Sequence, residues 1–222
     1  MTGTGIIKLK SSHRSGLAGL FFGFCTACSP GPSVPASAVP SVPLRIAVAD
    51  KQIIIAGPQD YCIDKAAARD SAAGSFVLLG SCAAIAGTAA AGQPVAPAIL
   101  TASVSPGGGP LIGQQLEALN GYFRSKPGLA ALSRSGQASA ISLQRAWGSD
   151  GVFYLAAHDR STGRRNNVQA EFWRAVFDLR GRIITLNVTG LKSRPLSEAA
   201  GRATLEAFVR QVQRENRKTT GL

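Results

Sequence analysis

The stretch WRAVFDLRGRIITL, residues 173–186, decides the fold. Side chains of a strand point alternately to opposite faces, so two sets are predicted to face apart: Phe172, Arg174, Val176 and Asp178 against Trp173, Ala175, Phe177 and Leu179. Arg180-Gly181 follows as a two-residue turn, after which β-branched residues return. The segment therefore predicts a β-hairpin with strands at 170–179 and 182–188.

Further strands are predicted upstream of this hairpin. Residues 138–147 and 152–157 flank the turn Gly148-Ser149-Asp150-Gly151, and strict alternation over 138–147 predicts another hairpin. Short runs rich in β-branched residues predict four more strands, at 45–49, 52–56, 75–79 and 98–104. The prominence of hairpins favours antiparallel pairing.

Two segments have helical periodicity. Residues 111–124 place apolar side chains three or four positions apart, and residues 196–216 carry a stripe of Leu205, Phe208, Val209 and Val212. Strands grouped around helices predict an α+β fold, in which a mostly antiparallel sheet packs with two or three helices in a single domain over 44–222. A membrane-spanning helix over 76–91 is an alternative, because no charged residue occurs between Ser71 and Leu116.

The first 27 residues are predicted to be an export signal. Lys8, Lys10 and Arg14 make its first part positive without any acid, and residues 15–27 are uncharged and rich in leucine and phenylalanine. This apolar run is shorter than the ~20 residues of a transmembrane helix, as in a signal peptide. The rest of the chain lacks the repeated long apolar runs of a polytopic membrane protein, and its hydrophobic content excludes global disorder.

The end of the leader, Thr26-Ala27-Cys28-Ser29, resembles the lipobox of bacterial lipoproteins. The resemblance implies that Cys28 is lipidated and becomes the new N-terminus, and that Ser29 directs the protein to the outer membrane. An ordinary secretion signal and an uncleaved anchor are the alternatives. Residues 28–43 hold five of the twelve prolines and no charge, so they predict an extended tether between Cys28 and the domain.

Cys62 and Cys82 are the two cysteines downstream of Cys28. Thiols of an exported domain meet an oxidising compartment, so these two are predicted to form a disulfide, with two separate buried thiols as the alternative. Neither belongs to a CxxC motif, so a zinc site is not expected. No other metal and no cofactor is predicted.

The C-terminal half resembles PsbP-like domains, on the hairpin 173–186, the segment Pro195-Leu196-Ser197 and the helix around Phe208. This resemblance implies helices packed against an antiparallel sheet. The whole chain is similar to a group of uncharacterised bacterial lipoproteins, on YCID at 61–64 and FVLLGSC at 76–82. Some members are labelled cation-transport ATPases, but the chain lacks both the DKTGT-like loop of a P-type pump and the GxxxxGK[ST] of a P-loop.

Positive charge is concentrated in the second half of the chain. Residues 44–123 carry four Lys/Arg and five Asp/Glu, whereas residues from 124 onward carry 17 and 7. In the densest cluster, Arg160, Arg164 and Arg165 are predicted to bind an anionic envelope component or an acidic protein partner, and a solvated basic surface is the alternative. Nucleic acid is not expected as a partner, because the protein is exported and carries no nucleic-acid-binding motif.

Few side chains are candidates for chemistry. His158 is the one histidine downstream of the leader, and the chain has no GxSxG nucleophile motif to accompany it. Three acids are predicted to be turn and cap residues, with glycosidase carboxylates or calcium ligands as the alternatives: Asp60, Asp64 and Asp70. Trp147 and Trp173 lie on strand patterns and are predicted to belong to the core rather than to a sugar-binding platform.

These features predict a lipid-anchored protein of the bacterial envelope that faces the periplasm. Its expected role is that of a binding or accessory module rather than an enzyme, and its expected membrane contact is the lipid anchor. Two alternatives stay open. One is an accessory subunit of an envelope transport system, and the other is a hydrolase of an envelope polymer that uses His158 with a nearby carboxylate.

Overall fold

A computed structural model describes residues 41–109, 111–161 and 167–217. The predicted leader, Cys28 and the tether up to residue 40 lie outside the described residues, as do Arg164 and Arg165. No helix among the described residues is long and apolar enough to span a membrane. Of the five large apolar side chains in 76–91, four belong to a strand instead, namely Phe76, Val77, Leu78 and Leu79.

The described residues form nine strands, four α-helices and three short 3-10 helices. The strands are β1 (Arg45–Val48), β2 (Ile53–Ala56), β3 (Tyr61–Ser71), β4 (Gly74–Ser81), β5 (Ala98–Val104), β6 (Ile141–Ser149), β7 (Val152–Asp159), β8 (Val168–Leu179) and β9 (Arg182–Leu191). The α-helices are α1 (Cys82–Ala86), α2 (Leu116–Arg124), α3 (Lys126–Leu132) and α4 (Glu198–Arg217). The 3-10 helices are η1 (Ala89–Ala91), η2 (Ile112–Gln114) and η3 (Ala138–Ala140).

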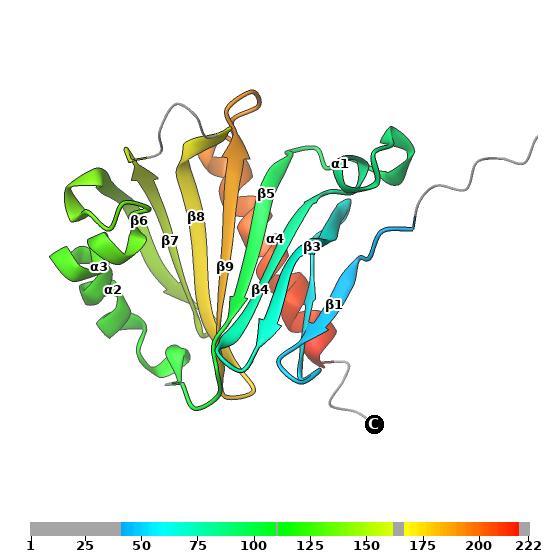
Figure 1. Cartoon of the computed structure of the whole chain (residues 1–222). Helices are drawn as coiled ribbons and strands as arrows, with labels where there is room; N and C mark the ends of the chain where they lie inside the picture. Colours follow the sequence, from blue (N-terminus) through cyan, green and yellow to red (C-terminus); the bar gives the residue numbers. More distant parts are fainter. Residues whose placement is uncertain (1–40, 110, 162–166, 218–222) are drawn as a thin grey trace, which may run out of the picture. The chain divides into compact units, whose positions relative to one another are not determined.

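Seven strands form one antiparallel sheet in the order β3-β4-β5-β9-β8-β7-β6, and β1 pairs with β2 in a separate hairpin (Figure 1). The predicted α+β class with a mostly antiparallel sheet is confirmed. The 173–186 hairpin forms β8 and β9, near the middle of the sheet. Arg180 and Gly181 of its turn have φ of 51° and 70°, the left-handed geometry that a tight hairpin turn requires.

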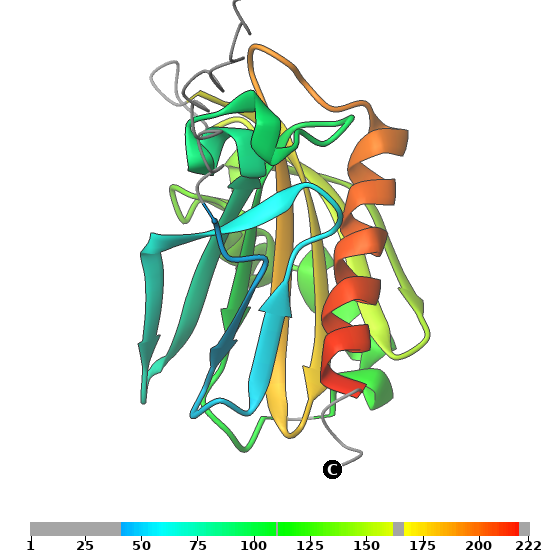
Figure 2. The same cartoon turned by 90° about the vertical axis from the view of Figure 1, so that its right-hand side faces the viewer.

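Helix α4 covers one face of the sheet, which we call the α4 face (Figures 1 and 2). The predicted stripe of Leu205, Phe208, Val209 and Val212 is buried there. It packs with β8 side chains of one alternation set, Trp173, Ala175 and Phe177, and with the β1–β2 hairpin. The alternation of β8 that the sequence predicts is therefore confirmed.

Helices α2 and α3 cover only part of the opposite face, which we call the cleft face. Phe123 of α2 and Leu132 of α3 pack there with Phe153, Leu155 and Phe172 of β7 and β8. Both helices pack on the β6 side of the sheet (Figure 1). Neither hydrophobic cluster of the described residues contains the side chains that β4 and β5 turn to this face. This uncovered part of the sheet is where the candidate site begins.

Two predicted elements differ from the sequence pattern. The helix expected at 111–124 starts only at Leu116, after the 3-10 helix η2, in which the N–H of Gly113 donates to the Asp178 carboxylate at 3.2 Å. The strand expected at 138–147 starts at Ile141 after η3. A register shift between Leu143 and Arg145 then ends the strict alternation.

The edge strand β3 is an element that the sequence pattern did not predict. Its carboxylates bind backbone groups: Asp64 accepts from the N–H groups of Ala66 and Ala67 where the register with β4 shifts. Asp70 accepts from the Ser75 hydroxyl at 2.6 Å and from the N–H of Ala49 at 3.1 Å, and these bonds lower the pKa of Asp70. These two acids therefore hold the backbone of β3 and its neighbours.

The Cys62–Cys82 disulfide joins β3 to the start of α1, with Cα atoms 4.8 Å apart. Both cysteines are buried. The prediction of this bond is confirmed.

Candidate anion-binding cleft

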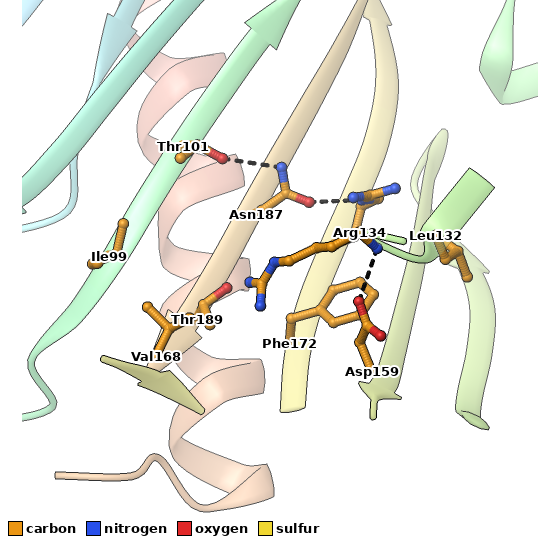
Figure 3. A pocket seen from close by; sticks show the side chains of 10 residues that line it. Ile99, Thr101, Leu132, Arg134, Asp159, Val168, Phe172, Asn187 and Thr189 are labelled. Carbon is orange, nitrogen blue, oxygen red and sulfur yellow. Dashed lines mark hydrogen bonds between the residues drawn. The ribbon is translucent and has the colours of Figure 1, made fainter. Parts of the chain in front are cut away.

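A cavity of about 260 Å³ opens on the cleft face, beside the part that α3 covers (Figure 3). Its floor comes from β5, β9 and β8, and Arg134, just after α3, reaches over it from the side. We call this cavity the arginine cleft. Its lining side chains are Ile99, Thr101, Leu132, Arg134, Asp159, Val168, Phe172, Arg174, Asn187 and Thr189.

Arg174 reaches the cleft because of the alternation of β8, where it lies between Phe172 and Val176. Its Nε donates to Asn187 Oδ1 at 2.6 Å, and Asn187 Nδ2 donates to Thr101 Oγ1 at 3.1 Å. The guanidinium carbon lies 5.5 Å from the centre of the Phe172 ring. A line of polar groups thus crosses three adjacent strands and fixes the orientation of the guanidinium.

Within the described residues, the charge of Arg174 has no carboxylate partner. No ion pair of the described residues involves Arg174. Burial lowers the pKa of the Arg174 guanidinium to about 10, and the positive charge of Arg134 acts in the same direction. A guanidinium has five N–H donors, and only Nε has a hydrogen-bond partner within the described residues. The remaining donors are therefore available to a ligand.

Asp159 is the one carboxylate in the described lining, and it is occupied by local bonds. It accepts from the N–H of Arg134 at 2.9 Å and from the hydroxyl and N–H of Ser161 at 2.5 and 2.9 Å. Burial acts to raise the pKa of Asp159, but these bonds and the charge of Arg134 outweigh it, so the net shift is downward. With Asp159 ionised, the two arginines leave the described lining with a formal charge of +1.

His158 does not belong to the cleft. It neighbours Asp159 on β7, and alternation turns it to the α4 face. Its Nδ1 lies 2.9 Å from Glu171 Oε1, so a carboxylate is close, and both side chains are partly exposed. Among the described residues, no hydroxyl or thiol is hydrogen-bonded to His158. The hydrolase hypothesis therefore has a carboxylate beside the imidazole but no nucleophile bonded to it, and it stays a prediction.

Of the predicted basic cluster, the structure describes Arg160, which lies beside the cleft rather than in it. Arg160 is exposed and donates to the carbonyl of Ser139, and it is not among the lining residues. Sequence reasoning placed Arg174 on the correct face but did not single it out, and it missed Arg134. One signal was present: a charged residue between two apolar ones on the same strand face, Phe172 and Val176.

The two tryptophans differ in environment. Trp173 is buried in the core on the α4 face, as predicted. Trp147 is partly exposed, but it stacks on Tyr154 with ring centres 5.2 Å apart. The guanidinium carbons of Arg145 and Arg202 lie 5.2 and 5.4 Å from its ring centre. Trp147 also packs against the hydrophobic cluster of the α4 face.

Comparison with known proteins finds no matching protein-family model, no matching curated protein and no matching solved structure. The resemblances to PsbP-like domains and to bacterial lipoproteins therefore stay predictions, and the function has to be argued from the cleft.

Proposed function

We propose that this protein is a lipid-anchored binding module of the bacterial envelope, which binds an anionic group in the arginine cleft. The observation that supports it most is Arg174, a partly buried guanidinium that lines a cavity and has no carboxylate partner in the part of the chain that the structure describes. Buried charges in proteins are normally paired, because taking an ion out of water is costly. An unpaired one at a cavity is a candidate ligand-binding group.

The geometry suits a carboxylate or a phosphate. A guanidinium presents parallel N–H groups that bind two oxygens of such an anion at once. Asn187 accepts the hydrogen bond from Nε of Arg174, so the guanidinium is already oriented before a ligand binds. Hydroxyls of Thr101 and Thr189 lie in the same lining and supply neutral polar contacts. The cavity volume of about 260 Å³ fits a small group rather than a large ligand.

Binding without chemistry is favoured over hydrolysis at this site. The described lining contains two arginines, an acid with all its bonds made locally, and neutral polar or apolar side chains. It contains neither a serine nor a cysteine, and His158 lies on the other face of the sheet. The same site would also serve an accessory subunit that recognises an anionic group on a transported molecule.

The test is a titration of the full chain with acetate and with inorganic phosphate, followed by calorimetry. Wild type should bind at least one of the two anions, and Arg174→Gln should lose this binding at least tenfold. Arg160→Gln is the matched control, since it removes an exposed arginine nearby. Equal losses in both variants would indicate general attraction to a basic surface, and no binding by wild type would refute the proposal.

The envelope location needs its own measurement, because Cys28 and the leader lie outside the described residues. The intact mass of the protein from bacterial membranes should exceed that of the chain from Cys28 onward by a diacylglyceryl group. The Cys28→Ser variant should lack this increment. A wild-type protein without it would refute lipid anchoring and leave the cleft proposal untouched.

A further inference from the structure

The cleft face continues from the arginine cleft into a second cavity. This cavity, of about 400 Å³, is lined by Phe76, Ser103 and Thr185 among others. Thr101 and Asn187 of the arginine cleft lie two residues away from Ser103 and Thr185 on the same strands, β5 and β9. Residues two apart on a strand share a face and lie ~7 Å apart, so the two cavities are neighbours along one surface.

Judged from the residues that the structure describes, this surface is uncharged between its two ends. Phe76 and Leu78 of β4 and Ile99 of β5 are partly exposed there, and none of them packs into either hydrophobic cluster. The side chains between them and Arg174 are hydroxyls and the Asn187 amide. Arg69 lies at the far rim, where its guanidinium donates to backbone carbonyls of its own strand. A positively charged cleft therefore adjoins an open face of apolar and neutral side chains.

The register gives the length of this face. Arg174 pairs with Asn187, Asn187 with Thr101, and Thr101 with Leu78, so Arg174 and Leu78 lie in one row across four strands. Three strand spacings correspond to about 14 Å. A ligand with its charge at Arg174 needs an apolar part of about that length to reach Phe76 and Leu78.

We infer that the ligand is an amphiphilic anion with a single alkyl chain, namely a fatty carboxylate of medium length. Its carboxylate binds Arg174 beside Arg134, and its chain lies across β9 and β5 towards Phe76. The single negative charge of a carboxylate matches the formal +1 of the described cleft lining, which favours it over a phosphate dianion. The inference rests on the proposed anion-binding function and adds the chemical class of the ligand.

The test uses the full chain in zwitterionic nanodiscs and decanoate with a photoreactive diazirine on its last carbon. After illumination, peptide mapping by mass spectrometry locates the label. We expect it on the peptides of β4 and β5, with competition by unlabelled decanoate and not by decanol. Phe76→Ser and Arg174→Gln should each reduce this labelling at least tenfold. Tyr122→Ser is the matched control, because Tyr122 is an exposed aromatic residue outside this face.

Ser103→Asp is a second variant for the same face, since it places a charge under the alkyl chain without removing a large side chain. It should reduce decanoate labelling and leave acetate binding unchanged. If the label lies on other peptides while the protein still binds acetate through Arg174, the inference of an amphiphilic ligand is wrong and the proposed anion-binding function is retained. Labelling of β4 and β5 that Arg174→Gln does not change would also overturn the inference, because the alkyl chain would then bind without the charged group, whereas the anion cleft is refuted separately by the absence of acetate and phosphate binding.

Discussion

Replacing Arg174 by methionine should make the fold more stable and abolish anion binding. Methionine keeps a long apolar side chain against Phe172 and removes the unpaired charge. Burial and the charge of Arg134 lower the pKa of Arg174 to about 10. At ~1.4 kcal/mol per pKa unit, the lowered pKa corresponds to a free-energy cost of ~3 kcal/mol for keeping Arg174 charged in the folded state. The native protein carries this cost at neutral pH.

Part of the gain is lost with the contacts that Arg174 makes. The variant loses the hydrogen bond to Asn187, worth ~1.5 kcal/mol for a charged donor, and the contact with the Phe172 ring, worth ~0.5 kcal/mol. The expected net gain in the free energy of unfolding is ~1 kcal/mol, or an increase in Tm of ~2–4 °C for a domain of this size.

Urea unfolding of the full chain at pH 7 measures this gain, with Arg160→Met as the control that should change little. The pH dependence checks its origin. Because the folded pKa of Arg174 is below its ordinary value, the cost is present below about pH 10 and is relieved as the pH rises above it. The advantage of Arg174→Met should therefore shrink in that range. A variant less stable than wild type by ~1 kcal/mol or more would show that Arg174 stabilises the fold.

Two further predictions concern the framework of the cleft. Replacing Cys62 and Cys82 by alanine should lower the free energy of unfolding by ~3 kcal/mol, because the disulfide closes a loop with a sequence separation of 20. Reductant should lower the urea midpoint of wild type by the same amount. A midpoint that reductant does not change would contradict the disulfide. Gly201→Ala should lower the free energy of unfolding by ~1–3 kcal/mol, because its Cβ would overlap ring atoms of Trp173. Gly121→Ala is the control, since its Cβ meets nothing within 4 Å; equal Tm values for both variants would refute the packing argument.

The central sheet could be predicted because its signals are local. The pair Asp150-Gly151 has positive φ at both residues, as Arg180-Gly181 does, and such turns join strands whose residues are adjacent in sequence. The stripe of Leu205, Phe208 and Val212 repeats at the helical period and is buried as a unit. In these elements, the pattern and the tertiary environment agree.

The elements that the sequence did not predict are those that tertiary contacts decide. Strand β3 carries Asp64, Lys65, Arg69 and Asp70 and a run of alanines, so it lacks the β-branched pattern of a strand. It forms at the edge, where charged residues also protect an open strand from pairing with other chains. The short helix α3 has only seven residues, too few to show a period.

The cleft depends on the strand order, which no local pattern specifies. Thr101, Arg174 and Asn187 are far apart in the sequence and meet only because β5, β9 and β8 are adjacent. Arg134 approaches from a segment that follows α3, and its position depends on its N–H bond to Asp159. Sequence reasoning could place Arg174 on a face, but not among these partners.

The difference between Arg160 and Arg174 shows why charge density alone is a poor guide to a binding site. Arg160 belongs to the densest run of arginines but is exposed, so water and salt weaken its attraction for an anion. Arg174 has no neighbouring arginine in the sequence but is partly buried, so its attraction for an anion is stronger and the cost of leaving its charge unpaired is higher. An anion bound at Arg174 offsets that cost, and by linkage it stabilises the fold in proportion to the logarithm of its concentration above Kd. Anion-dependent stabilisation of wild type, absent in Arg174→Met, is therefore the behaviour that separates a binding site from a basic surface.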